Sequence, residues 1–231
     1  MKILQVDLIS STPGAASLRF PVRSQIVFVG RSNVGKSSLI NALIRRKLAR
    51  TSRSPGKTDL VNIYRVRLAV TANQIQTIDF VDLPGYGYAR GGTRRAESFA
   101  KITEHYFKAA REPSVADDSA MLALHLVDSR HSDLKSDRDA HAWLESHGLT
   151  TITVGTKADT VPRAEHKRVA QTLGSRTGGR VLLLSAKSGD GLKDLWKMII
   201  QASYRLSLIH ISEPTRRYAI EDAGVGVKKK R

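Results

Sequence analysis

The sequence contains no cysteine, which excludes disulfide frameworks, thiolate metal sites and cysteine nucleophiles. No apolar run approaches the roughly 20 residues that a membrane-spanning helix requires, so we expect no membrane span. Residues 1–10 also lack an apolar core of signal-peptide length. These absences favour a soluble protein, and the expected location is cytoplasmic.

Acidic residues are scarce relative to basic ones. The chain has 21 Asp and Glu against 38 Lys and Arg, which leaves a formal net charge of +17. An excess of this size favours a polyanionic partner, and for a soluble protein nucleic acid is a commoner partner than a membrane surface. The seven histidines show no metal-ligand spacing, so we expect no metal site other than one for Mg²⁺.

The hydrophobic pattern alternates between strand-like and helix-like segments. Residues 25–30 form a nearly continuous apolar run, typical of a strand buried on both faces, and a helical period begins at Lys36. Residues 61–70 alternate instead, which indicates an antiparallel strand in a hairpin with 75–82. Further strands are expected at 121–128, 151–156 and 181–184, and helices at 95–110, 136–147, 163–173 and from 190. Because strands separated by helices form parallel βαβ units, we predict an α/β fold. Its sheet is expected to be mostly parallel and six-stranded, with one antiparallel edge strand and helices on both faces.

One domain with two appendages accounts for the 231 residues. Residues 1–24 are broken by proline and glycine and indicate a surface arm with room for a first strand, whereas 25–205 form the domain. Residues 206–231 have no steady period and end in four consecutive basic residues, so we expect a disordered basic tail. Three interpretations of the tail stay open: a solvated segment, an RNA-contacting segment, or a non-native extension, since SLIHISEPTR resembles a translated sequencing adapter.

A phosphate-binding loop carries the first chemical signal. Residues 30–37, GRSNVGKS, match GxxxxGK[ST] at every fixed position, between a predicted buried strand and a helix. Its two glycines let backbone N–H groups point at a phosphate chain. Lys36 would reach the β- and γ-phosphates, and the Ser37 hydroxyl would bind Mg²⁺. The nucleotide contacts predicted here are Gly30, Arg31, Ser32, Asn33, Val34, Gly35, Lys36 and Ser37.

A DxxG motif follows a later predicted strand, at Asp82-Leu83-Pro84-Gly85. An aspartate at this place can hold Mg²⁺ through water, and the N–H of Gly85 can bind the γ-phosphate and sense its loss. The pattern is weak on its own, because aspartate–glycine turns are common. Its position after the phosphate loop, at the end of a neighbouring strand, makes the functional interpretation the better one.

Two further motifs favour guanine. In Thr156-Lys157-Ala158-Asp159 the Asp159 carboxylate would accept from the N1–H and the 2-amino group of guanine, and the Lys157 stem would cover the ring. Adenine has an acceptor at N1 and no 2-amino group, so it would leave buried polar groups unpaired. Ser185-Ala186, after the last predicted strand, would place a backbone N–H against the guanine O6. The four motifs in this order predict a guanine-nucleotide site.

The order GRSNVGKSS, SPGKT, DLPGYGYA, TKAD and SAK resembles the TRAFAC-class translation-factor-like GTPases and, within them, the EngB (YihA/YsxC) family. The diagnostic pieces are DLPGYGYA at 82–89 and LARTSRSPGKT at 48–58, supported by LVDSRH at 126–131, and the likeness spans residues 8–203. It implies a Ras-like P-loop GTPase domain that hydrolyses GTP to GDP during large ribosomal subunit assembly, with defects in cell division and septation when it is lost. The implied partners are that subunit or its precursor, with rRNA and ribosomal proteins, and we expect a monomer.

The resemblance also assigns roles to residues. The first switch would be 53–60, with Thr58 as the second magnesium ligand beside Ser37, and the second switch would begin at Gly85 and end at Gly92. The expected catalytic groups are Lys36, Thr58 and Gly85. Further nucleotide contacts implied in this way are Gly56, Lys57, Thr58, Asp59, Leu60, Leu83, Pro84, Ala158, Leu184 and Ala186.

Two residues suggest how hydrolysis would differ from that of Ras. Tyr86 stands where Ras-like enzymes carry a water-orienting glutamine, and a phenol cannot orient water in the same way. We therefore expect slow hydrolysis without a partner. Asn33 occupies a loop position that helps to hold K⁺ in several related GTPases, where the ion could replace an arginine finger; the alternative is a loop asparagine bonded to backbone.

Basic residues cluster beside both expected switches, within 45–57 and 90–111. The residues are Arg45, Arg46, Lys47, Arg50, Arg53, Lys57, Arg90, Arg94, Arg95, Lys101, Lys108 and Arg111. Their charge is either simply solvated or makes phosphate-backbone contacts that depend on the nucleotide state. Two other functions stay open: an RNA-binding module with a structural nucleotide site, and an ATP-using P-loop enzyme.

Overall fold

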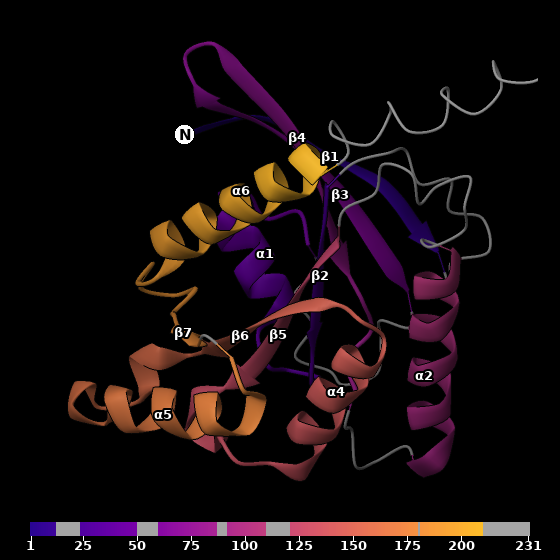
Figure 1. Ribbon diagram of the computed structural model, residues 1–231, viewed down its shortest axis with the longest axis vertical. Coiled ribbons are helices and arrows are strands. Elements are labelled where there is room, and N and C mark those ends of the chain that lie inside the picture. The colour runs from indigo at the N-terminus through magenta and orange to yellow at the C-terminus, as the bar shows by residue number, and fades with distance from the viewer. Residues whose placement is uncertain (13–23, 50–59, 87–91, 110–120, 180, 210–231) are drawn as a thin grey trace, which may run out of the picture.

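The computed structural model describes residues 1–12, 24–49, 60–86, 92–109, 121–179 and 181–209 (Figure 1). The strands are β1 (Lys2–Thr12), β2 (Ser24–Gly30), β3 (Val61–Thr71), β4 (Gln74–Asp82), β5 (Met121–Asp128), β6 (Thr150–Thr156) and β7 (Val181–Leu183). The helices are α1 (Lys36–Ile44), α2 (Gly92–Ala109), α4 (Lys135–Ser146), α5 (His166–Thr177) and α6 (Leu192–Ile209). Short 3₁₀ turns lie at Ser129–His131, Ala158–Thr160 and Arg163–Glu165.

All seven strands form one sheet in the order β1-β3-β4-β2-β5-β6-β7. From β4 to β7 the neighbouring strands are parallel, whereas β3 runs antiparallel to both β1 and β4. The predicted α/β class, the mostly parallel sheet and the β3–β4 hairpin are confirmed. The expected count of six strands, with the antiparallel strand at the edge, is wrong because β1 pairs along the outer side of β3 (Figure 1).

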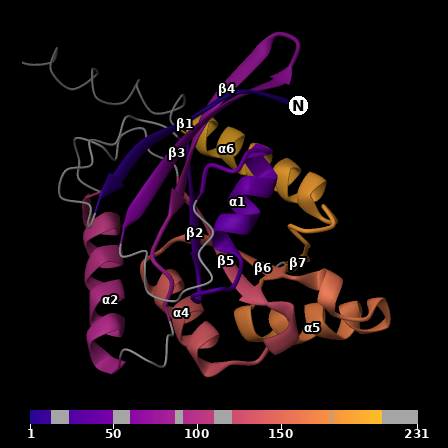
Figure 2. The same ribbon diagram turned by 180° about the vertical axis from the view of Figure 1, so that it is seen from behind.

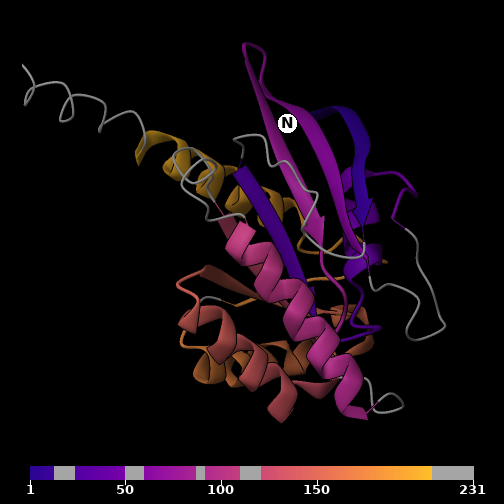
Figure 3. The same ribbon diagram turned by 90° about the vertical axis from the view of Figure 1, so that its right-hand side faces the viewer.

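Helices cover both faces of the sheet, as expected. The helices α1 and α6 lie on one face (Figure 2). Their apolar residues pack there, and Trp196 Nε1 of α6 donates to the carbonyl oxygen of Leu43 at 3.3 Å. The opposite face is covered by α2, α4 and α5, and Figure 3 looks directly onto α2. Burial of β5 on both sides explains its continuous apolar run, since Leu124 faces the first layer and Ala123 the second. Within the described residues, no helix is both long and apolar enough to cross a membrane.

Candidate functional site

The predicted motifs meet at one edge of the sheet. The phosphate loop follows β2, the DxxG segment follows β4, TKAD follows β6 and SAK follows β7. These four strands are parallel, so their carboxyl ends share one edge (Figure 1). Such an edge of an open α/β sheet is where ligands of this fold class bind.

The phosphate loop has the backbone that its glycines permit. Gly35 has a φ of 111°, which side chains of L-residues rarely adopt, and it directly precedes α1. At Gly30 an added Cβ would lie 2.8 Å from the carbonyl oxygen of Leu126, so the close approach of β2 to β5 requires glycine there. The Lys36 ammonium turns back over the loop and donates to the carbonyl oxygens of Gly30 at 3.1 Å and Arg31 at 3.4 Å.

Ser37 and Asp82 lie together beside Lys36 although they are far apart in the sequence. The Ser37 hydroxyl donates to Asp82 Oδ2 at 3.4 Å. Asp82 is buried, and its Oδ1 has no hydrogen-bond partner among the described residues. Burial raises the pKa of Asp82 to about 6, against the opposing effect of the Lys36 charge. Burial also lowers the pKa of Lys36, a shift that Asp82 opposes.

This donor set fits a hard divalent cation. Hydroxyl and carboxylate oxygens are the ligands that Mg²⁺ takes in nucleotide sites, usually together with several waters. The orphaned Asp82 Oδ1 is a buried acceptor that such a cation or its water would satisfy. Thr58, the other expected ligand, lies outside the described residues, as do Gly56, Lys57 and Asp59; Leu60 directly precedes β3.

The DxxG segment lies directly against the phosphate loop. An added Cβ at Gly85 would lie 2.7 Å from the backbone nitrogen of Ser32, so only glycine fits at this approach. The Ser32 N–H donates to the carbonyl oxygen of Tyr86 at 3.0 Å, and Arg31 and Tyr86 form an isolated parallel bridge. The parallel pairing of β2 with β4 thus continues into the two loops. Residues 87–91 of the expected second switch lie outside the described part of the chain.

Tyr86 is turned into the protein. The residue is 7% exposed, and its hydroxyl lies 2.9 Å from both Asp137 Oδ1 and His125 Nε2. A hydroxyl held in this way is bound to protein groups rather than to solvent. The expectation that Tyr86 does not replace the water-orienting glutamine agrees with this orientation.

The TKAD and SAK segments are tied to the phosphate loop and to each other. Thr156 Oγ1 donates to the carbonyl oxygen of Val34 at 2.7 Å, and Lys157 Nζ donates to that of Asn33 at 2.7 Å. The Ser185 hydroxyl donates to Asp159 Oδ1 at 2.6 Å. Backbone N–H groups of Lys187 and Ser188 in turn donate to Ser185 Oγ, and Ala158 N–H donates to the carbonyl oxygen of Leu184. One carboxylate oxygen of Asp159 is thereby held in place at this edge.

Asp128 is a supporting residue that the motif analysis missed. It ends β5, and its Oδ2 accepts from Lys157 Nζ at 2.9 Å and from Arg130 Nη2 at 2.7 Å. Burial alone would raise the pKa of Asp128, but the hydrogen bonds from Arg130 and Lys157 hold it well below its usual range. The ionised carboxylate therefore fixes the Lys157 ammonium. The backbone of Lys157 has a left-handed φ of 57°. The segment LVDSRH at 126–131, which supports the family resemblance, contains Asp128 but gave it no role in the site.

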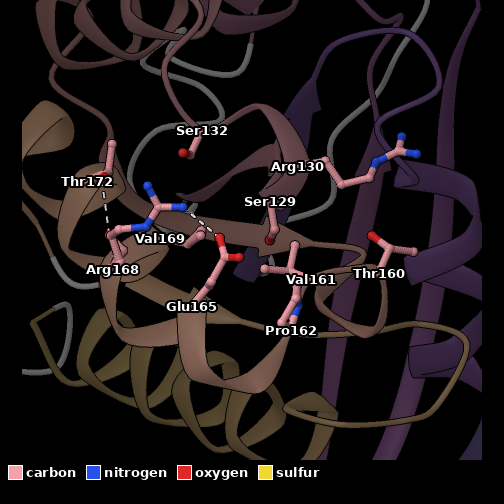
Figure 4. Close-up of a pocket in the computed structure, with 10 residues that line it drawn as sticks. All are labelled: Ser129, Arg130, Ser132, Thr160, Val161, Pro162, Glu165, Arg168, Val169 and Thr172. Carbon is pink, nitrogen blue, oxygen red and sulfur yellow. Dashed lines mark hydrogen bonds and ion pairs between the residues drawn. The ribbon is translucent and has the colours of Figure 1, made fainter.

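A separate pocket of about 220 Å³ lies between the turn after β5 and α5 (Figure 4). Its two arginines are already paired: Arg130 with Asp128, and Arg168 with Glu165 at 2.6 Å. Within the described ranges, no group of three or more His, Cys, Asp or Glu side chains is placed to hold a metal ion. The site at the phosphate loop is therefore the better-supported binding site.

Comparisons with known proteins show the family to which the chain belongs. The family model described as "50S ribosome-binding GTPase" matches residues 25–157. A probable GTP-binding protein EngB of Geobacillus kaustophilus is 35% identical over 205 residues, which cover 87% of this chain and 97% of that protein. A probable GTP-binding protein EngB of Alkaliphilus metalliredigens is 36% identical over 203 residues, which cover 85% of this chain and 89% of that protein. The crystal structure of a probable GTP-binding protein EngB shares the fold, with a TM-score of 0.53 at 20% identity over 78% of this chain and 99% of that one. The chain therefore belongs to the EngB family of P-loop GTPases.

Proposed function

We propose that the chain is a molecular switch that binds GTP with Mg²⁺ at the phosphate loop, hydrolyses it to GDP, and acts in assembly of the large ribosomal subunit. The observation that carries the nucleotide part is the meeting of Ser37 with the buried Asp82 beside Lys36. A role in cell division and septation would follow from failed ribosome assembly. We also propose that it acts as a cytoplasmic monomer.

In this proposal Lys36, Thr58 and Gly85 stabilise the transferred phosphoryl group, and Ser37 and Thr58 hold the metal. Bound Mg²⁺ would supply positive charge to the phosphate oxygens as negative charge develops on them. Asp159 and Lys157 would bind guanine, and the hydrogen bond from Ser185 to Asp159 would fix the carboxylate before the base arrives. A K⁺ ion at Asn33 is a further proposal, tested by exchanging K⁺ for Na⁺ in the hydrolysis assay.

A basic turn after α1 supports contact with ribosomal RNA. Arg45, Arg46 and Lys47 are exposed, and none of the described acidic side chains forms an ion pair with them. The turn is held by Asn41, whose side chain donates to Ala49 O at 2.7 Å and accepts from Ala49 N–H at 2.8 Å. Cations carried on a turn with a fixed backbone suit a phosphate backbone, because less backbone freedom is lost on binding.

Two measurements test the proposal. In a nucleotide-competition assay GTP and GDP should displace a fluorescent guanine nucleotide, whereas equal displacement by ATP would favour an ATP-using enzyme. Sedimentation with ribosomal subunits should show tighter association with the large subunit in a GTP analogue than in GDP, falling as salt rises. Equal binding in both nucleotide states, without hydrolysis, would favour an RNA-binding module with a structural nucleotide site.

A further inference from the structure

A buried polar network holds the residue that follows the DxxG motif. The Tyr86 hydroxyl donates to Asp137 Oδ1 on α4 at 2.9 Å, so its one hydrogen is used there. The 2.9 Å contact with His125 Nε2 then requires the imidazole to donate. Burial lowers the pKa of His125 to about 3, which keeps its ring neutral with the proton on Nε2.

The same carboxylate also binds the phosphate loop. Arg31 Nε lies 3.0 Å and 3.2 Å from the two oxygens of Asp137, and the two side chains are only 19% and 6% exposed. Asp137 therefore joins a side chain of the phosphate loop to the side chain directly after DxxG. A hydrogen bond to a charged, partly buried carboxylate is among the stronger kinds in proteins.

Backbone contacts place Gly85 beside the network of Tyr86, Asp137 and Arg31. The carbonyl oxygen of Tyr86 accepts from Ser32 N–H at 3.0 Å, and Gly85 approaches Ser32 so closely that no Cβ fits. The N–H of Gly85 is the group expected to bind the γ-phosphate. Its position is set by Tyr86, one residue further along the chain.

We propose that Tyr86 is a positioning residue for GTP hydrolysis, which acts with Asp137 and Arg31 to hold the Gly85 N–H in a fixed place against the phosphate loop. This inference rests on the proposed GTP site. Gly85 has no side chain of its own to hold it, so without the bonds of Tyr86 its N–H would have to be ordered in the transition state at a cost in conformational entropy. That cost would reduce kcat and leave GDP affinity nearly unchanged, because GDP has no γ-phosphate for Gly85 to bind.

Tyr86→Phe tests the proposal, with Tyr106→Phe as its matched control. Tyr106 is a fully buried tyrosine in the same apolar cluster, and its hydroxyl donates to Gln25 Oε1, away from the phosphate loop. Tyr86→Phe removes the bonds of this hydroxyl to Asp137 and His125. It should lower the single-turnover rate constant of hydrolysis by roughly three- to thirtyfold, the range expected for loss of buried hydrogen bonds, with GDP affinity within about twofold. Both variants should lower the thermal midpoint of unfolding by similar amounts, because each loses a buried hydroxyl. The rate of hydrolysis in Tyr106→Phe should stay within about twofold of the wild type.

Asp137→Asn supplies a second variant that removes the charge but keeps the shape. Asp137→Asn should also lower kcat. The double variant with Tyr86→Phe should hydrolyse GTP no more slowly than the slower single variant, because both substitutions break the same network. Unchanged kcat in Tyr86→Phe, an equal loss in Tyr106→Phe, or fully additive losses would each overturn the positioning role. Wild-type protein that neither binds nor hydrolyses GTP would instead refute the proposed function.

Discussion

Mild acid should destabilise the folded protein through His125. Its side chain is fully buried, and burial, assisted by the nearby His141, lowers its pKa to about 3. In the unfolded chain a histidine has a pKa of about 6.5. Because the folded pKa is the lower one, the unfolded state binds the proton first as the pH falls. The stabilisation is fully present above pH 6.5 and is lost progressively between pH 6.5 and pH 3.

The expected loss can be worked from these two pKa values. At pH 5 the unfolded histidine is almost fully protonated and the folded one is neutral. Between about pH 6.5 and pH 5, roughly 1.5 pH units, the unfolding free energy therefore falls by about 1.36 kcal/mol per unit. This single group should therefore remove about 2 kcal/mol of unfolding free energy between pH 7 and pH 5. For a domain of this size that corresponds to a fall in Tm of about 4–8 °C.

The assay compares urea unfolding of the wild type, His125→Gln and His131→Gln at pH 7, 6 and 5. His131 is exposed, so its variant should follow the wild-type pH dependence. His125→Gln should be less stable than the wild type at pH 7, because it loses buried ring packing. Between pH 7 and pH 5 its unfolding free energy should fall by about 2 kcal/mol less than that of the wild type. Parallel curves for all three proteins would show that His125 titrates normally in the folded state, and the reasoning would fail.

Three further predictions concern the nucleotide and the particle. Asp159→Asn should weaken GTP binding by about 100-fold and favour xanthine nucleotides, because an amide can donate to the oxo group that replaces the 2-amino group; equal XTP and GTP competition profiles in variant and wild type would contradict this. Ser37→Ala should weaken Mg²⁺-dependent GTP binding and hydrolysis with little change in Tm, and wild-type hydrolysis would rule out the metal assignment. Replacing Arg45, Arg46 and Lys47 by Glu should reduce sedimentation with the large subunit at low salt while GTP affinity is kept. Unchanged sedimentation would contradict a contact between these residues and the subunit.

Strands and helices with continuous or periodic apolar patterns were predictable from the sequence. The run at 25–30 indicated a strand buried on both faces, and β2 is buried between β4 and β5. The strand β1 was harder to predict, because six of its eleven residues are polar or charged and it exposes Leu4 and Leu8 to solvent. What makes it a strand is the backbone pairing offered by β3, which depends on tertiary structure and has no local signal.

The motif positions of the site were predictable for a different reason. A phosphate loop requires particular residue types at fixed spacing, so Gly35, Lys36 and Ser37 are visible in the sequence alone. The groups that orient the motif side chains have no such spacing. Asp128 reaches Lys157 across 29 positions and Asp137 reaches Arg31 across 106, and only the fold brings each pair together. An aspartate with no motif around it cannot be distinguished from one on a solvated surface.

The inward orientation of Tyr86 limits how hydrolysis can be completed. Its hydroxyl is bound to Asp137 and His125, so it does not reach an attacking water in this arrangement. In the proposed mechanism Lys36 would stabilise charge on the phosphate, but Tyr86 and not a carboxamide side chain follows DxxG in the sequence. A group that orients water must then come from a segment outside the described residues, from a cation, or from the partner particle. Adding large subunits to a single-turnover assay tests whether the particle takes part, because the chemical step depends on particle concentration if the particle supplies that group or positions it, and is independent of it otherwise.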